Sequence, residues 1–250
     1  SMTASHCILW GHLALYRWRF DQDTMSMGKI GALLLFLALS QCNNYDLVDK
    51  LENPGTTPGE PGEKETYANS YYVFVSSWST LGAMGGSPYS DCNGIGGAAG
   101  ADCACTRAAI ARGLRRSGTH VFRAWLSTSS ADAKCRVQAQ GNGCATAIPG
   151  PWFNTIGGIV VNDYNDFSES LVSPISLDEF GVSQGVTGVW TGTLSTGAMA
   201  PAATCADWTL LTGPTGRLGD RNFSTALWTD NGNNDCSNAF RVYCVASPFF

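Results

Sequence analysis

The sequence predicts an α+β domain that is rich in loops and depends on disulfide bonds. Three observations support this class: a cysteine-rich C-terminal part, one alanine-rich helical segment, and several short strand-like stretches separated by glycine, proline and asparagine. The chain has 250 residues, of which 44% are hydrophobic and 14% are charged, so one domain with extensions is expected.

The expected elements begin at Tyr71. Residues 71–76 (YYVFVS) are aromatic and β-branched, which predicts a first strand. Asp102 gives a helix-start signal, an alanine-rich run extends to Arg112, and Gly113 gives a stop. Further short strand-like stretches are expected at 121–126, 158–161, 188–194, 205–211 and 240–246.

The N-terminal part indicates export. Residues 27–29 form a short basic region, 30–39 an apolar run, and Leu39-Ser40-Gln41-Cys42 a cleavage site. The apolar run is too short to span a bilayer. This segment resembles a bacterial lipoprotein signal in which Cys42 becomes lipidated and forms the new N-terminus. Gln41 departs from the small residue usual there, and plain secretion after cleavage at Ser40 is the alternative.

Composition divides the chain into four parts. Residues 1–26 are interpreted as an upstream extension or a remnant of cloning, and 27–42 as the signal peptide. Residues 43–66 are polar and contain three prolines and three glycines, which is typical of a tether. Residues 67–247 form the expected domain.

The cysteines also indicate an oxidising compartment. The chain has ten, of which eight fall in the expected domain. Zinc ligation is the alternative, but the sequence has no CxxC pair, and His120 is the only histidine beyond residue 12. The eight are Cys92, Cys103, Cys105, Cys135, Cys144, Cys205, Cys236 and Cys244.

Four ordered segments carry a family resemblance. They are 100–130 (GADCACTRAAIARGLRRSGTHVFRAWLSTSS), 188–193 (GVWTGT), 204–209 (TCADWT) and 236–245 (CSNAFRVYCV). Together they resemble the successive motifs of the endostatin domain of certain collagens. They resemble still more the bacterial lipoproteins described as leptospiral endostatin-like, whose domain has no assigned function.

The resemblance implies a C-type-lectin-like fold. Such a fold has two helices, a twisted antiparallel sheet, and a long loop region closed by nested disulfides. Carried onto this chain, it pairs Cys105 with Cys244 and Cys205 with Cys236. Cys103 and Cys105 project about 200° apart on a helix and so need different partners. The economical local pairs for the remaining four are Cys92 with Cys103 and Cys135 with Cys144.

Charge and side-chain chemistry argue against nucleic-acid binding and against catalysis. The net charge is −5 and the pI near 5.1, whereas phosphate binding needs a clustered basic surface. His120 is the only histidine that could serve a serine nucleophile in the domain. The carboxylate pairs Asp163/Asp166 and Asp178/Glu179 lie in loops and are expected to be solvated. We therefore expect no enzymatic activity.

One local stretch is basic. Between Cys103 and Gln140, seven arginine and lysine residues stand against Asp132 alone, a balance of +6. Endostatin is similar in holding heparan sulfate with surface arginines, and guanidinium groups suit sulfate and phosphate. An ordinary solvated basic surface is the alternative. The candidates for binding an anionic ligand are Arg107, Arg112, Arg115, Arg116 and Arg123.

Residues 227–244 (LWTDNGNNDCSNAFRVYC) resemble a calcium loop at first sight. Counted from Asp230, an EF-hand needs glycine and glutamate where Asp235 and Arg241 stand. The sugar-reading triplets of calcium-binding lectins are also missing between Cys205 and Cys236. A capped turn is favoured over calcium. The weak metal candidates are Asp230, Asn231, Asn234 and Asp235.

We therefore expect a non-enzymatic recognition module, held by a lipid anchor in a bacterial envelope, at the outer membrane or cell surface. The resemblance implies extracellular partners: host matrix proteins, complement regulators, plasminogen or heparan sulfate. A calcium-dependent lectin and a structural envelope lipoprotein without a soluble ligand are the alternatives.

Overall fold

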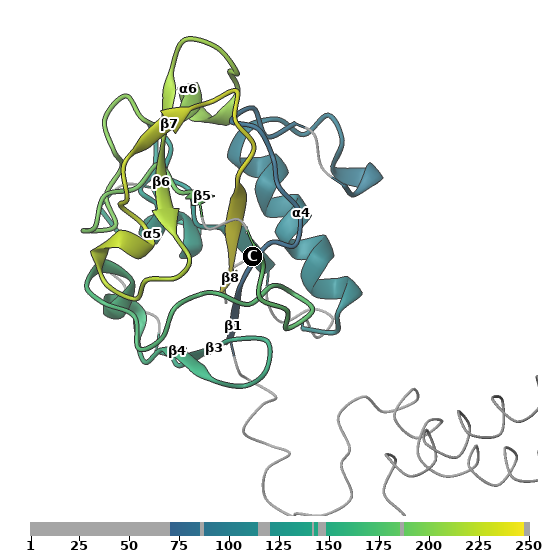
Figure 1. The fold of residues 1–250 in the computed structure, drawn as a ribbon, viewed down its shortest axis with the longest axis vertical. Helices are drawn as coiled ribbons and strands as arrows, with labels where there is room; N and C mark the ends of the chain where they lie inside the picture. Colours follow the sequence, from purple (N-terminus) through teal and green to yellow (C-terminus); the bar gives the residue numbers. More distant parts are fainter. Residues whose placement is uncertain are drawn as a thin grey trace, which may run out of the picture. The chain divides into compact units, whose positions relative to one another are not determined.

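The last strand of the chain, β8 (Arg241–Ser247), lies in the middle of the sheet. It pairs antiparallel with β1 (Tyr71–Val75) and β2 (Val121–Ala124), and parallel with β5 (Gly188–Trp190). The computed structural model describes residues 71–85, 88–114, 121–141, 143–144, 149–185 and 188–247. Figure 1 shows β8 in the middle of the domain, with β5 on one side of it and the helix of residues 97–111 on the other.

The sheet is mixed. Its strand order is β4-β3-β1-β8-β5-β6-β7, and β2 pairs with β8 off this path. The β1–β3 and β5–β8 pairs are parallel, so the expected antiparallel sheet is only mainly antiparallel. The strands not yet given are β3 (Trp152–Phe153), β4 (Ile159–Val161), β6 (Thr215–Asp220) and β7 (Asn233–Asp235).

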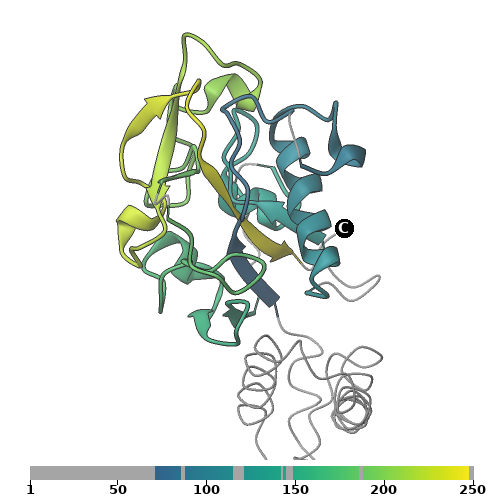
Figure 2. The ribbon, with the colours of Figure 1, turned by 45° about the vertical axis from the view of Figure 1, so that its right-hand side comes forward.

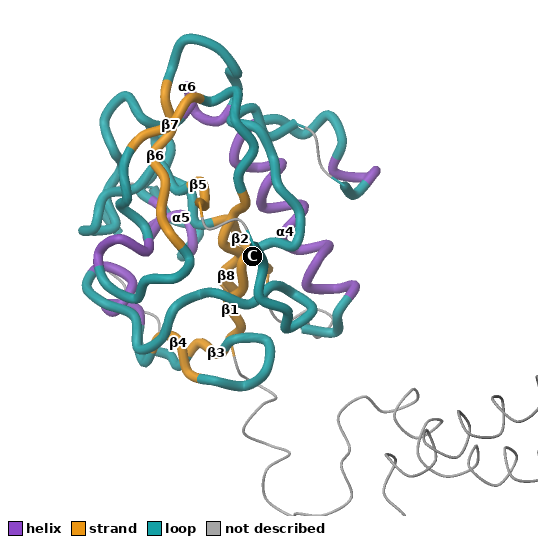
Figure 3. The backbone as a smooth tube through the Cα atoms, viewed as in Figure 1, coloured by secondary structure: helices purple, strands orange, loops and turns teal. Residues whose placement is uncertain are grey.

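Helices are few. The long one is α4 (Gly97–Ala111), which packs on β2 and β8. Both ribbon views show it beside β8 (Figures 1 and 2). Loops make up much of the rest (Figure 3). The short helical segments are η2 (Ser90–Cys92), α5 (Ala133–Val137), η3 (Tyr164–Ser168), α6 (Cys205–Trp208) and η4 (Ala226–Trp228).

Strand β8 is buried on both faces because two hydrophobic cores lie against it. Tyr243 and Val245 point into one core, with Trp125, Trp152 and Trp228. The alternate residues of β8 point into the other core, beneath α4. They are Val242, Cys244 and Ala246. Five of the six tryptophans of the expected domain are therefore core residues.

Small residues allow α4 to lie close to the sheet. Ala101, Ala104, Cys105 and Ala108 recur at helical spacing and are buried. The helix begins at Gly97 rather than at Asp102, so the predicted start was wrong. Asp102 lies inside the helix, where its carboxylate bonds to β2 instead of capping the first turn.

A second correction concerns residues 205–211, where a strand-like stretch was expected. Cys205, Ala206, Asp207 and Trp208 all have positive φ, between 49° and 65°, and form a left-handed turn. L-residues avoid this conformation, at about 1–2 kcal/mol each. Trp208 Nε1 donates to the Ser127 carbonyl at 2.8 Å, and Asp207 accepts from the Ser129 backbone N–H at 2.6 Å. These bonds hold the turn in place.

The described residues belong to one unit, which runs from Asn69 to Phe250. It contains both cores and all eight cysteines of the expected domain. Within the part of the chain that the structure describes, no helix is long and apolar enough to cross a membrane. Cys42, the signal segment and the tether lie outside the described residues.

Candidate functional site

A groove of about 370 Å³ lies between α4 and β2. Arg107 lines it from the helix and Arg123 from the strand, so two different elements each contribute an arginine. Apolar side chains from both elements add carbon surface between them. The lining residues are Asp102, Cys103, Thr106, Arg107, Ile110, Val121, Phe122 and Arg123.

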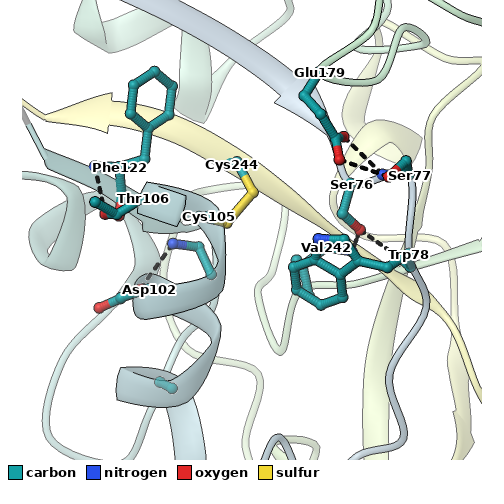
Figure 4. The surroundings of a disulfide bond; sticks show 12 residues. Ser76, Ser77, Trp78, Asp102, Cys105, Thr106, Phe122, Glu179, Val242 and Cys244 are labelled. Carbon is teal, nitrogen blue, oxygen red and sulfur yellow. Dashed lines mark hydrogen bonds between the residues drawn. A yellow bond between two sulfur atoms is a disulfide. The ribbon is translucent and has the colours of Figure 1, made fainter. Parts of the chain in front are cut away.

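Two side chains of α4 fix the groove by bonding to the outer edge of β2. Thr106 Oγ1 accepts from the Phe122 N–H at 3.1 Å and donates to the Phe122 carbonyl at 2.9 Å. Asp102 Oδ1 accepts from the Ala124 N–H at 2.8 Å (Figure 4). Because β8 occupies the other edge of β2, the helix satisfies backbone groups that would otherwise stay unpaired.

Disulfides support the same region. Cys105 in α4 is bonded to Cys244 in β8, directly beside the groove-forming contacts (Figure 4). Cys92 is bonded to Cys103, which lines the groove. The disulfide expectation is confirmed, and the other two bonds are Cys135–Cys144 and Cys205–Cys236.

The two arginines of the groove differ in their partners. Arg107 forms an ion pair with Asp91, and both side chains are about half exposed, at 49% and 44%. Arg123 Nη1 lies 3.6 Å from Asp102, and Arg123 Nε is buried without a hydrogen-bond partner among the described residues. An exposed ion pair contributes little stability, so Arg107 can exchange its partner at low cost.

The basic run of the sequence is divided by the fold. Arg107 and Arg123 meet in the groove, whereas Arg112 lies beyond the end of α4 with its guanidinium 4.3 Å from the Phe180 ring centre. Arg136 turns inward and bonds to Asp102 at 2.6 Å. The candidates Arg115 and Arg116, like His120, lie outside the described residues.

The residues considered for calcium are held by other partners. Asp230 pairs with Arg217, and its second oxygen accepts from the Ser195 N–H at 3.0 Å. Asn231 donates its backbone N–H to the Leu218 carbonyl. A calcium ion would have to compete with the Arg217 guanidinium for the Asp230 carboxylate.

Asn234 and Asp235 serve the turn after β7. Asn234 Oδ1 accepts from Asn238 Nδ2 at 2.7 Å, and Asp235 Oδ1 accepts from the Ser237 N–H at 2.9 Å. This backbone hydrogen bond holds the pKa of Asp235 below its ordinary value. The described segments contain no group of three side chains of the metal-binding types. The arrangement fits capped turns.

The expectation that Asp178 and Glu179 are solvated was wrong, because both are buried. Asp178 Oδ1 accepts from the N–H groups of Phe180 and Val182, each at 2.9 Å. Glu179 accepts from the Ser77 N–H at 2.8 Å and from its hydroxyl at 2.5 Å (Figure 4). Each carboxylate therefore anchors a loop.

A partly buried guanidinium, that of Arg241, lies in the field of these acids. Burial lowers the pKa of Arg241, as does the charge of Arg221, while Asp178 and Glu179 raise it. Arg241 donates to the Ser76 carbonyl at 2.6 Å and to Gln184 at 2.9 Å. The sequence offered no sign of this cluster, since its members are far apart along the chain.

Known proteins offer no further guide. No family model matches the chain, and no curated protein matches it. The functional proposal therefore rests on the groove, its charges and the disulfide-bonded frame.

Proposed function

We propose that this domain is an exported, non-enzymatic recognition module that binds an anionic glycan or an anionic protein segment in the α4–β2 groove. The observation that carries the proposal is that Arg107 of α4 and Arg123 of β2 line the same open groove, together with apolar side chains. A sulfated or carboxylated sugar has both features that this surface complements, negative oxygens and carbon-bound hydrogens.

The exposed ion pair of Arg107 with Asp91 supports the proposal of an anionic ligand in the groove. A ligand sulfate can replace the half-exposed Asp91 carboxylate without leaving a buried charge unpaired. Among the described residues, the buried Nε–H of Arg123 has no hydrogen-bond partner, so a ligand oxygen that reached it would satisfy an unpaired donor. By contrast, Arg136 is committed to the Asp102 carboxylate and two backbone carbonyl groups. It would not contribute to binding.

The same proposal includes a C-type-lectin-like fold. Three features support it: the pairing of the first and last strands, β1 with β8, the two helices α4 and α5, and a long loop-rich region between β2 and β8. The Cys105–Cys244 bond joins helix to last strand, and Cys205–Cys236 closes the loop region within that span. This nesting matches what the endostatin resemblance implies.

The setting that we propose is a bacterial envelope, with the domain held through a lipid on Cys42. Plain secretion is the alternative. Four disulfides in one domain suit an oxidising, extracytoplasmic compartment. The partners that the resemblance implies remain host matrix proteins, complement regulators, plasminogen and heparan sulfate.

Heparin chromatography of residues 69–250, with disulfides intact, tests the groove. We expect salt-sensitive retention that falls in Arg107→Ala and in Arg123→Ala, because each removes one cation from the groove. Asp91→Asn should elute at higher salt, since it frees Arg107. Arg112→Ala is the matched control, because it removes the same charge outside the groove lining.

Two results would overturn the groove as the site. Equal loss of retention in Arg112→Ala and Arg107→Ala would indicate a diffuse basic surface. Unchanged retention in both groove variants, alongside loss in Arg115→Ala/Arg116→Ala, would move the site to the segment after α4. Near-UV circular dichroism of each variant checks that the tryptophan-rich cores are intact.

A further inference from the structure

Five large apolar side chains are exposed on three neighbouring loop segments. The most exposed is Ile156, at 73%, at the tip of the β3–β4 hairpin, and the others lie between 42% and 54%. We name this surface the hairpin patch. It consists of Ile156, Ile159, Val172, Phe180 and Val182.

Printed contacts join the three segments. A Cβ at Gly181 would lie 3.0 Å from Ile156 Cγ2, and Thr155 donates its hydroxyl to the Asp178 carbonyl at 2.9 Å. Ser173 donates its hydroxyl to the Ile159 carbonyl at 2.7 Å. The exposed residues therefore come from loops that are hydrogen-bonded to one another, and the acids beneath them, Asp178 and Glu179, are buried.

The hairpin patch lies at the end of the domain where the chain enters. Tyr71, the first described residue, pairs with Trp152 of β3, and their rings lie 5.1 Å apart. In both ribbon views, β3 and β4 lie at the start of β1, and α6 lies at the opposite end of the domain (Figures 1 and 2). The start of β1 and the hairpin patch therefore lie at the same end of the domain.

A cation borders the same surface. The Arg112 guanidinium stacks 4.3 Å from the centre of the Phe180 ring, which is itself half exposed. Aromatic and aliphatic side chains next to arginine are typical of segments that enter the headgroup region of a bilayer.

We propose that the hairpin patch docks onto the lipid surface that carries the anchor. This rests on the proposed lipidation of Cys42. In the sequence, 28 residues separate Cys42 from Tyr71, and a flexible chain of that length spans roughly 30 Å, so a lipid on Cys42 would keep the patch within reach of the bilayer. Tethering raises the effective concentration, and a small apolar patch then suffices for docking.

A lipid surface fits the patch better than a second copy of the chain. Ile156 projects from a hairpin tip, and a deformable interface can accept a single projecting side chain without a matching pocket. A stable protein interface instead needs complementary packing over a large area. Docking by this end also leaves the α6 end facing away from the membrane.

The test supplies the anchor chemically. In residues 42–250 the four disulfides leave Cys42 as the only free thiol, which can be coupled to a maleimide lipid in phosphatidylcholine vesicles. Ile156→Trp then reports insertion through quenching by brominated lipid. Leu210→Trp is the matched control, because Leu210 is 51% exposed in the segment after α6.

We expect quenching of Ile156→Trp to exceed that of Leu210→Trp by roughly twofold or more, and Phe180→Ser to reduce it. Vesicles containing phosphatidylglycerol should increase the difference through Arg112. Equal quenching at the two sites would overturn the proposal. So would a dimer, seen by light scattering, that Ile156→Ser abolishes. Heparin retention of the same chain is a separate readout, so failure here leaves the groove proposal standing.

Discussion

Arg136 Nη2 lies 2.6 Å from Asp102 Oδ2, and this pair joins the helix after β2 to α4. Arg136 also donates to the carbonyl groups of Ala124 and Leu126, at 3.2 Å and 2.7 Å. One cation of the basic run is therefore part of the internal frame. The Asp102 carboxylate is closer to Arg136 than to Arg123, at 2.6 Å and 3.6 Å, so Arg123 is less strongly bound by it and could pair with a ligand.

Removal of Arg136 should be far more harmful than removal of Arg107. We expect Arg136→Ala to lower the free energy of unfolding by about 3 kcal/mol, because Asp102 and two carbonyl groups lose a buried partner. Arg107→Ala breaks an exposed pair and should lower it by less than about 1 kcal/mol. Urea unfolding with disulfides intact measures both. Similar losses in the two variants would contradict the assignment of Arg136 to the frame.

Gly82 is required beside the Cys205–Cys236 bond. A Cβ at this position would lie 2.6 Å from both Cys205 Sγ and Cys236 Cβ, and 2.9 Å from the Cys236 carbonyl oxygen. We expect Gly82→Ala to destabilise the domain by about 2–3 kcal/mol, since none of these atoms can move freely. Gly85→Ala is the control, because nothing lies within 4 Å of its Cβ position. A loss shared by both variants would exclude the steric explanation.

Elements were predicted correctly where the local residue pattern favours the same conformation that the tertiary contacts require. The strand at 71–76 and the strand at 240–246 are aromatic and β-branched, and both are central to the sheet. The strand predicted at 205–211 was wrong because long-range contacts determine the backbone conformation of this stretch. The bond from Cys205 to Cys236 and the hydrogen bond from Trp208 to Ser127 hold a conformation that no local propensity favours.

The sequence indicated only some of the residues that form the groove. Its arginines were found as a cluster of charge, but their separation depends on how α4 packs against β2, which residue spacing along the chain does not give. Thr106 was missed altogether. Its hydroxyl is one of two side-chain groups that pin the helix to the strand edge, and a threonine in an alanine-rich helix carries no such signal.

Glycine should relieve the strain of the left-handed turn. Ala206 is exposed with φ of 51°, a conformation that glycine adopts without penalty. We expect Ala206→Gly to raise the free energy of unfolding by about 1 kcal/mol. Ala111→Gly, at an exposed position in the right-handed helix α4, should lower it by about 0.5–1 kcal/mol. Thermal unfolding compares them, and a loss in both would contradict the left-handed assignment.

The four disulfides should differ in their contribution. On the chain-entropy model, Cys105–Cys244 closes a separation of 139 residues and contributes about 5 kcal/mol, while Cys205–Cys236 closes 31 and contributes about 3.5 kcal/mol. Cys92–Cys103 closes only 11, for about 3 kcal/mol. Paired Cys→Ser variants, unfolded in urea, should follow this order. If Cys92–Cys103 stabilised the domain as much as Cys105–Cys244, the disulfide would have to act on the folded state as well as on the unfolded chain.

Alkaline pH should destabilise the domain through its buried tyrosines. Burial raises the pKa of Tyr243 well above its ordinary value, and the nearby charge of Asp220 adds to this. Burial also raises the pKa of Tyr164. As pH rises above the ordinary tyrosine value, the unfolded chain releases these protons while the folded chain keeps them. The free energy of unfolding should then fall by up to about 1.4 kcal/mol per pH unit for each tyrosine.

Substitution with phenylalanine separates this effect from other alkaline changes. At neutral pH, Tyr243→Phe should lower the free energy of unfolding by about 1 kcal/mol, because the hydroxyl donates to the Trp228 carbonyl at 3.0 Å. Above the ordinary tyrosine pKa, the free energy of unfolding of Tyr243→Phe should fall less steeply with pH, because one buried tyrosine no longer contributes to the slope. We expect a similar reduction of the slope in Tyr164→Phe. Urea unfolding between neutral pH and pH 11 measures both slopes. If the slope is unchanged in both variants, alkaline unfolding has another origin.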